Sequence, residues 1–507
     1  MQHTITDHEI PGRDGVRVLV RLGISPEEHV LIFKYRMAAD AIDFPVFYQG
    51  RKLVFGDFYG GTHTTIWDID SPHQARAFIA GIRRGFADFE KFLESNRKPV
   101  QYEPPPVPWD FFDTDARFEG TWIKGEQGWG KTTLLSALIE EDLGKVAAGK
   151  ASVIVIDSQN EHLGRFLPRL PRFAPGHDLH DKLVYLEPDL DHPLALNLLN
   201  FKGYGQLSKN EQFERSQTVL EMLNFFIGAT IGEQSGHMKN IIGYCLRALA
   251  LMPEPTIMDF KDLLVDGRLK NILKDKSSPL HKLDDATKRF LLTDLFKNYG
   301  PSLTAVANRL DAFDNNDMLK AFFSQPKNRF NFYELLRKPH VIVINTMERR
   351  LQTKEALGLF GRYFLALLMG VVRARTSGGL PCYVHVDECW QYIKDEPIVG
   401  ELIATARRQK IALTFAQQHK GQITNTEVRK ALQTCGVQID TGKKQHHWNV
   451  QVRKGEVHEV SPPDVDFSKI DGMTDPEWQL VLDHMHETYC AEPPRAGKPD
   501  EEMPDAV

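Results

Sequence analysis

Short runs in which hydrophobic and polar residues alternate dominate the first hundred residues of the chain. The runs VRVLVRL, HVLIF, FPVFYQG and KLVFGDF are typical of β-strands, and the spacing from Pro72 to Ser95 is typical of a helix. Five prolines then fall between Lys98 and Trp109, where they exclude a helix or a central strand and favour a stiff connector. We therefore predict a small β-rich N-terminal domain over residues 1–110, with a proline-rich linker at its end.

From Phe118 onward the pattern changes to nearly continuous apolar runs rich in β-branched residues. The runs ASVIVID, HVIVIN, CYVHVD and IALTFAQ are separated by helical spacing and glycine turns. Such alternation is expected of a parallel sheet that helices cover on both faces, because its strands are buried on both sides. The sequence therefore predicts an α/β fold with a parallel-type central sheet, formed by residues 111–206 and 337–450.

A long segment between these strands carries helical spacing instead. Runs such as FERSQTVLEMLNFFIGA and HMKNIIGYCLRALALM lie in it, so we predict an all-α insertion domain over residues 207–336. After Val450 the run VQVRKGEVHEV predicts a hairpin and DPEWQLVLDHMHETY a helix, which together give a C-terminal region over residues 451–490. Four prolines and five acidic residues predict a disordered tail over residues 491–507.

Composition and charge limit the class of protein. The 507 residues are 42% hydrophobic and 26% charged, with a net charge of -6, which is typical of a soluble globular protein and requires any nucleic-acid contact to be local. The five cysteines lack CxxC spacing, which argues against a disulfide framework. The N-terminus lacks the apolar core of a signal peptide, and the most apolar run, Tyr363 to Val372, has ten residues, about half of a membrane span. We expect a cytoplasmic protein without direct membrane insertion, in which this run is a buried core helix.

The segment GEQGWGKTT fits the pattern GxxxxGK[ST] and stands between a strand-like run and an apolar helix. Glycines let backbone N–H groups curl around phosphate oxygens, and the helix N-terminus adds partial positive charge. Lys131 would reach the β- and γ-phosphates of ATP, and Thr132 would place its hydroxyl on Mg²⁺, while Thr133 packs or caps. The alternative is a chance glycine turn before a helix. The predicted nucleotide-binding residues of this loop are Gly125, Gln127, Gly128, Trp129, Gly130, Lys131, Thr132 and Thr133.

Two adjacent acidic residues end another predicted strand, in the run YVHVDE. Asp387 is the candidate Mg²⁺ ligand, and Glu388 is the candidate general base that polarises the attacking water. Such a pair is a weak signal alone, but its partnership with the glycine loop strengthens it. Asp157, at the end of ASVIVID, competes for the metal but lacks a following acid. We therefore predict that it faces the nucleotide site from behind Asp387; the alternative is a solvated aspartate at a strand end.

A third predicted strand, Ile411 to Ala416, ends in two glutamines that could sense the γ-phosphate or orient water, and we choose Gln417. Upstream, Arg407 and Arg408 stand at a helix end rich in basic residues. In a ring of subunits, one of these arginines could reach the γ-phosphate of the neighbour, where its charge offsets that of the transition state. The alternative is a solvated helix C-terminus, where basic side chains offset the helix dipole. The predicted catalytic residues are thus Lys131, Glu388, Gln417, Arg407 and Arg408.

In order along the chain, the segments GEQGWGKTT, VIVIDSQNE, YVHVDECWQYI and ATARRQKIALTFAQQ resemble the HerA/FtsK superfamily of hexameric pumping ATPases. Within it, the chain looks most like the TraG/TraD-type coupling proteins of type IV secretion, over about residues 118 to 450. The resemblance implies a RecA-like domain, ATP and Mg²⁺ as cofactors, a ring of six copies that threads DNA, and secretion or relaxase-type protein partners. Asp387 and Glu388 match the acid pair of the family. Coupling proteins usually carry N-terminal transmembrane helices, whereas this chain begins with a β-rich domain. A soluble relative, a plasmid or phage packaging motor, and a coupling protein that another subunit recruits to the inner membrane are therefore all open hypotheses.

Basic residues gather between Arg407 and Lys444, where eight stand against two acids. This excess favours contact with the DNA backbone, although a solvated charged face is an equal alternative for any one lysine. Aromatic residues are sparse there, which argues against base stacking. The sequence therefore predicts an ATP-dependent DNA translocase of the coupling-protein type. A protein-secretion or phage-type packaging ATPase and a nucleotide-gated ring scaffold are the alternatives.

Overall fold

The computed structural model describes seven strands between Thr6 and Asp68 and most of the chain from Thr114 to Ala491. Gaps in the second part fall at residues 160–161, 200, 202, 229–234, 266–267, 376–378 and 397. Two compact units divide the chain, Met1–Tyr102 and Glu103–Val507. The helix predicted from Pro72 to Ser95, the proline-rich linker and the tail beyond Ala491 lie outside the described residues.

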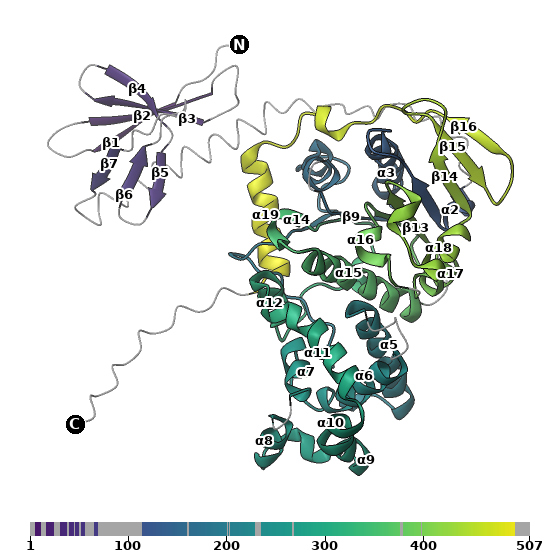
Figure 1. Cartoon of the computed structure of the whole chain (residues 1–507). Helices are drawn as coiled ribbons and strands as arrows, with labels where there is room; N and C mark the ends of the chain where they lie inside the picture. The colour runs from purple at the N-terminus through teal and green to yellow at the C-terminus, as the bar shows by residue number, and fades with distance from the viewer. Residues whose placement is uncertain are drawn as a thin grey trace, which may run out of the picture. The chain divides into compact units, whose positions relative to one another are not determined.

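In the first unit the strands form two antiparallel sheets, coloured purple in Figure 1. One sheet has the order β1-β2-β3-β4 and the other the order β5-β6-β7. Their bounds are β1 Thr6–Pro11, β2 Arg17–Ile24, β3 Leu31–Met37, β4 Asp40–Phe44, β5 Val46–Gln49, β6 Lys52–Phe55 and β7 Thr65–Asp68. The alternating runs of the sequence fall on β2, β3, β5 and β6, because a strand turns successive side chains to opposite faces.

The second unit is built on a mixed sheet of nine strands in the order β10-β11-β9-β12-β13-β8-β14-β15-β16. Neighbours from β10 to β14 are parallel, and the last two pairs are antiparallel. The predicted α/β fold class is confirmed by this sheet and the helices around it. The strand bounds are β8 Thr121–Lys124, β9 Ser152–Asp157, β10 Leu183–Leu186, β11 Val341–Asn345, β12 Cys382–Val386, β13 Ile411–Gln417, β14 Val437–Thr441, β15 Trp448–Val452 and β16 Val457–Val460.

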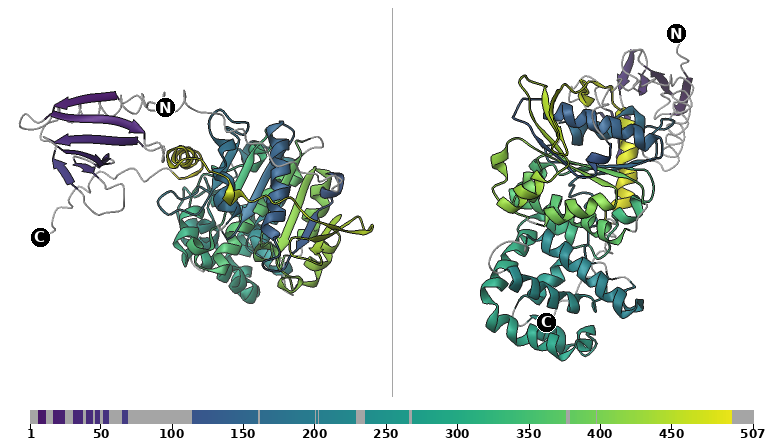
Figure 2. Two further views of the ribbon diagram at one scale, coloured as in Figure 1. Left: turned by 90° about the horizontal axis from the view of Figure 1, so that it is seen from above. Right: turned by 90° about the vertical axis from the view of Figure 1, so that its right-hand side faces the viewer.

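Helices cover both faces of this sheet (Figure 2). The connection from β8 through α3 to β9 runs along the sheet in one direction, whereas those from β11 to β12, β12 to β13 and β13 to β14 run in the other. Because parallel crossovers are right-handed, α3 lies on one face and the other connecting helices lie on the opposite face. The helices beside the sheet are α2 Thr114–Arg117, α3 Lys131–Ala147, α4 Leu163–Phe166, α14 Glu348–Leu351, α15 Lys354–Ala374, α16 Trp390–Ile393, α17 Val399–Arg408 and α18 Thr426–Gln433.

Helices follow one another in the long segment between β10 and β11, at the bottom of Figure 1. Aromatic rings form its core; Phe226 packs on Phe313, Phe323 and Tyr363 with ring centroids between 5.1 and 5.7 Å apart. We propose that this segment is a separate insertion domain over residues 207–336. Its helices are α5 Lys209–Phe226, α6 Ser235–Leu249, α7 Ile257–Leu263, α8 Arg268–Lys274, α9 Asp285–Arg289, α10 Leu295–Asn298, α11 Gly300–Asp314, α12 Asp317–Phe323 and α13 Phe332–Leu335.

The ten-residue apolar run Tyr363 to Val372 is part of a helix that is longer than the run itself. It forms the second half of α15, which has 21 residues. Among the described residues, α15 is the one helix that is long and apolar enough to cross a membrane. Within its most apolar stretch, 78% is buried inside the protein. Gly361 of α15 lies against the ring of Tyr392, so that a methyl group at this glycine would overlap the ring. The helix is therefore packed tightly against the segment that follows β12.

The hairpin and the helix predicted after Val450 are present. β15 and β16 pair antiparallel at one edge of the sheet. The helix is α19, Asp475–Tyr489, which lies by β10 at the opposite edge, where the Tyr185 and Trp478 rings pack 5.1 Å apart. The chain thus returns across the sheet after β16 and covers its other end.

A buried cluster of charges anchors α3 to β12. The Arg117 guanidinium donates to both carboxylate oxygens of Asp142 at 2.8 and 2.6 Å, and Nε2 of His385 lies 2.9 Å from the same carboxylate. Lys145 Nζ donates to it at 2.9 Å. Burial by itself would raise the pKa of Asp142, but the Arg117 charge and the contacts with His385 and Lys145 hold it well below its usual value. Asp142 is therefore the anion that this cluster requires.

Replacement of Asp142 by asparagine is expected to lower the free energy of unfolding by about 3–5 kcal/mol, because the buried Arg117 loses its bidentate carboxylate and, among the described residues, keeps only Glu141, 3.9 Å away, as an ion-pair partner. The depressed pKa means that Asp142 stabilises the fold fully above the unfolded value of about 4, and that this contribution falls as the pH drops below it. Urea unfolding from pH 7 to pH 3 tests both points. Asp142→Asn should lose part of the acid-dependent slope, whereas the exposed control Asp191→Asn should match the unsubstituted chain at each pH.

Candidate nucleotide site at the carboxyl edge of the sheet

The glycine-rich loop joins β8 to α3, which is the strand, loop and helix order that the motif requires. Gly128 and Gly130 have φ of 75° and 94°, in the left-handed region that side chains with a Cβ rarely adopt. Gly130 is also the N-cap of α3, so the loop turns directly into the helix. The free N–H groups of the first helical turn can therefore face an anion held by the loop.

The acidic pair lies against this loop. Asp387 and Glu388 follow β12 directly, and Lys131 Nζ donates to Asp387 Oδ1 at 2.7 Å and also contacts Glu388 Oε1. Burial alone would lower the pKa of Lys131, but the two carboxylates raise it, so the amine is charged. Residues 256 positions apart in the sequence thus share one ion-pair cluster.

Glu388 is held from three sides. Its side chain is buried, Trp390 Nε1 donates to Oε2 at 2.7 Å, and Gln418 Nε2 donates to Oε1 at 3.2 Å. Its φ of 46° is unusual for a residue other than glycine, which shows that the surrounding contacts fix this position. Glu388 therefore presents its carboxylate in one orientation, as a general base must.

Asp157 ends β9, the strand next to β12, and Asp387 N donates to the carbonyl of Ile156 at 2.9 Å. Its own carboxylate accepts from Gly164 N at 2.7 Å and from Gln159 N at 3.2 Å. Burial, together with the nearby charge of Asp387, raises the pKa of Asp157 to about 6. Its carboxylate lies buried at the same sheet edge as the acid pair, where it also holds the loop after β9.

The two glutamines after β13 take different positions. The Gln417 side chain is buried and donates to the His419 carbonyl at 2.9 Å, whereas the Gln418 amide reaches Glu388. The sequence favoured Gln417, but the structure brings Gln418 to the candidate base. The physical reason is that consecutive residues at the end of a strand point in opposite directions. Trp390 was missed by sequence reasoning, since an aromatic donor two residues after an acid belongs to no motif.

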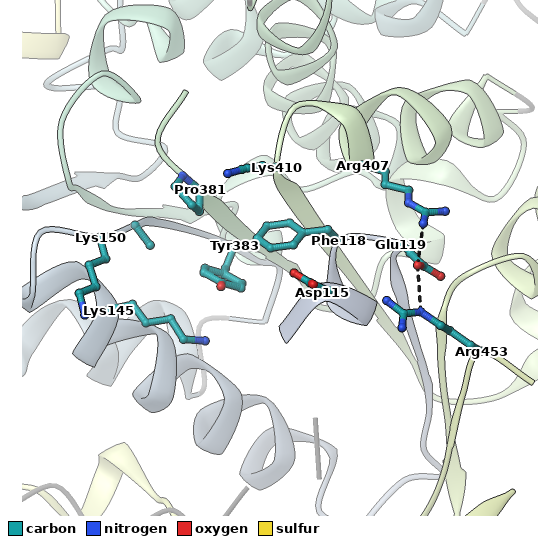
Figure 3. Close-up of a pocket in the computed structure, with 11 residues that line it drawn as sticks. Asp115, Phe118, Glu119, Lys145, Lys150, Pro381, Tyr383, Arg407, Lys410 and Arg453 are labelled. Carbon is teal, nitrogen blue, oxygen red and sulfur yellow. Dashed lines mark hydrogen bonds and ion pairs between the residues drawn. The ribbon is translucent and has the colours of Figure 1, made fainter. Parts of the chain in front are cut away.

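Arg407 and Arg408 lie at the end of α17, before β13 begins, and hence at the amino edge of the sheet. Arg407 Nη2 pairs with Glu119 Oε1 at 2.8 Å, and Arg453 Nε pairs with the same oxygen at 3.0 Å. Figure 3 shows both arginines reaching Glu119 at the rim of a cavity of about 680 Å³. The structure therefore does not bring either predicted arginine to Lys131 within one chain.

Trp129, Thr132 and Thr133 flank Gly130 and Lys131 in the chain. Trp129 is half-buried and donates from Nε1 to the His447 carbonyl at 3.1 Å. Thr132 and Thr133 open α3 directly after Lys131. The Thr132 hydroxyl and the two carboxylates at this sheet edge are oxygen ligands of the kind that Mg²⁺ prefers. The Lys131 amine beside them is a cation suited to phosphate. The strand, glycine loop and helix, with the acid pair facing them, form the arrangement that the phosphate-binding motif of the sequence predicts.

No family model and no curated protein sequence matches the chain. Solved structures that are similar to it include the plasmid coupling protein TrwB in complex with ADP and Mg²⁺, with 15% identity, a TM-score of 0.46, and 71% of this chain and 82% of that chain covered. TrwB with the ATP analogue ADPNP gives 14% identity, a TM-score of 0.47 and the same coverage. VirB4 of Thermoanaerobacter pseudethanolicus gives 11% identity and a TM-score of 0.42, over 71% of this chain and 91% of that chain. TrwB is described as a bacterial conjugative coupling protein.

Proposed function

We propose that this chain is an ATP-hydrolysing motor of the coupling-protein type, which moves DNA through a ring of six copies. The observation that carries the ATPase part is the contact of Lys131 with Asp387 and Glu388 beside the glycine loop. Arg407 and Arg408 would act on the nucleotide of a neighbouring copy, since they lie at the other sheet edge. In the cell the ring would act in the cytoplasm, where secretion or relaxase-type proteins bring it to the inner membrane.

The roles of the site residues follow from their chemistry. The N–H groups of the loop from Gly125 to Gly130 would hold the phosphates of ATP, and Lys131 would exchange its carboxylate contacts for phosphate oxygens. Thr132 and Asp387 would hold Mg²⁺, which neutralises charge on the phosphates when bound. Glu388 would take the proton of the attacking water, with its carboxylate positioned by the amide of Gln418 and the indole of Trp390.

DNA is the substrate that the charge pattern supports, although the structure spreads the eight basic residues of that segment over several elements, of which two groups stand at sheet edges. Arg407, Arg408 and Lys410 lie where α17 joins β13, at the amino edge of the sheet. Lys443 and Lys444 lie in the turn after β14, at the carboxyl edge. In a ring, Lys410 at one edge and Lys443 and Lys444 at the other would meet the phosphate backbone at different levels of the channel, while Arg407 and Arg408 act on the neighbouring nucleotide.

DNA should therefore stimulate ATP turnover by the intact chain several-fold at about 50 mM salt, and the stimulation should weaken steeply as salt rises, because phosphate contacts release counterions. The measurement is steady-state phosphate release with and without a duplex, alongside the mass of the assembly with ATP. Equal turnover with and without DNA would remove DNA as the substrate and leave a protein-secretion ATPase. A nucleotide-gated scaffold would be favoured if the ring assembles only when ATP is bound, but neither hydrolyses the ATP nor responds to DNA.

A further inference from the structure

A short turn from another part of the chain is hydrogen-bonded to the glycine loop. This turn, Gly442–His447, joins β14 to β15 and is called the strap below. Gln445 Nε2 donates to the Gly128 carbonyl at 2.6 Å, and His446 N donates to the Trp129 carbonyl at 3.1 Å. With the bond from the Trp129 indole to the His447 carbonyl, three hydrogen bonds join the strap to two successive residues of the loop.

The contact is also steric. The His446 ring lies directly on Gly130, and a methyl group at Gly130 would overlap it. The Trp448 ring, at the start of β15, lies in the same way on Gly125. Both ends of the loop are therefore covered by β15 and the turn that leads into it, so the loop glycines provide space for the strap as well as for the curvature of the backbone.

The strap determines which way a loop amide points. A peptide group is planar and almost always trans, so that its N–H points away from its C=O. The bond from His446 N to the Trp129 carbonyl hence turns the Gly130 N–H away from the strap. Gln445 fixes the preceding carbonyl, that of Gly128, from the same side. The strap thus holds carbonyl oxygens outward in a loop whose phosphate-binding groups are N–H donors.

The other end of the strap is fastened to the edge of the sheet. Lys443 N donates to Glu459 Oε1 at 3.0 Å, and His447 Nδ1 lies 3.7 Å from the same oxygen. Glu459 belongs to β16, the last strand of the sheet. Gly442 N closes the turn by donating to the His447 carbonyl at 2.8 Å. Glu459 therefore holds the strap in the position from which Gln445 and His446 reach the loop.

We propose that the strap is a positioning element for the nucleotide, which sets the affinity of the loop for the triphosphate of ATP through Gln445 and His446. This inference rests on the proposed function, since it concerns the same loop. It assigns a role to exposed residues that no phosphate-binding motif contains. It also makes Glu459 a remote determinant of nucleotide affinity.

The test compares Gln445→Ala and Gln445→Glu, which both remove the donor to Gly128, with Glu456→Ala, an exposed residue in the neighbouring turn between β15 and β16. Titration with the analogue ADPNP and Mg²⁺ should show Kd raised about three- to tenfold in both Gln445 variants and unchanged in Glu456→Ala. KM for ATP should rise likewise with kcat nearly unchanged, and the melting temperature without nucleotide should stay within a degree or two. Glu459→Ala should raise Kd in the same direction by a smaller factor.

Unchanged Kd and KM in both Gln445 variants would overturn the inference, and the strap would then be packing alone. The proposed function has its own control in Lys131→Ala. If ADPNP binding is lost in Lys131→Ala but unaffected in the Gln445 variants, the role of the strap is contradicted and the proposed nucleotide site is supported. If the unsubstituted chain fails to bind ADPNP, both proposals are contradicted. A fall in kcat without a change in KM would also count against a positioning role in nucleotide binding.

Discussion

ATP should remain bound but almost unhydrolysed when Glu388 is replaced by glutamine. The change keeps the size of the side chain and one of the two oxygens that accept from Trp390 and Gln418, but removes the carboxylate that takes the proton from water. General-base catalysis contributes about 10²- to 10⁴-fold, so kcat should fall by at least a hundredfold. Phosphate release under saturating ATP measures kcat, and ADPNP titration measures binding. The ratio of the two effects identifies a base, because a binding residue would change Kd as well.

The matched control for this variant is Glu214→Gln, at an exposed position of α5, which should keep both kcat and Kd. If Glu388→Gln hydrolyses ATP at the rate of the unsubstituted chain, Glu388 is not the base. Asp157 is then the next acid to test, because its raised pKa gives it a basicity closer to neutral pH than that of an ordinary aspartate.

Lys131→Ala should abolish ATP binding in the micromolar range, with Kd raised at least a hundredfold. The reason is the loss of charge-assisted hydrogen bonds to two phosphates, each of which contributes about 1.5–3 kcal/mol. In the absence of nucleotide the same change leaves Asp387 and Glu388 side by side without the cation that now pairs with them. The melting temperature should therefore also fall, and ATP should no longer raise it.

Lys150→Ala is the control for this second experiment, because Lys150 is exposed beyond the far end of α3. It should leave the binding curve and the melting temperature unchanged. ATP binding by Lys131→Ala with the affinity of the unsubstituted chain would contradict the assignment of the phosphate site, since the lysine would then be only a partner for the acids.

The strands predicted from the sequence were those with the strongest burial signal. β9, β11, β12 and β13 are continuous apolar runs because the sheet buries both of their faces. β10 has only four residues, and β14 alternates buried and half-buried side chains in VQIDT, so neither produced a comparable run. Continuous hydrophobicity thus locates central strands but not short or partly covered ones near the edges.

The parts of the site that could be predicted are those set by a local pattern or by the topology of the sheet. The loop from Gly125 to Thr132 is a local pattern, and the meeting of Lys131 with Asp387 could be predicted because parallel strands end at one edge of a sheet. The side on which Gln417 and Gln418 point depends on where β13 ends, and a shift of one residue reverses it. The strap could not be predicted, because the hydrogen bonds of Gln445 and His446 join the loop to residues over 300 positions away.

The contact of Gly361 with Tyr392 has a mechanical consequence. Tyr392 stands four residues after Glu388, and α15 packs on α5 of the helical segment. Close-packed interiors do not absorb displacement, so a shift of the backbone at the acid pair has no free volume to occupy at this glycine. We therefore expect that a shift of the acid pair, if ATP turnover produces one, is passed to α15 and from there to α5 and the helical segment.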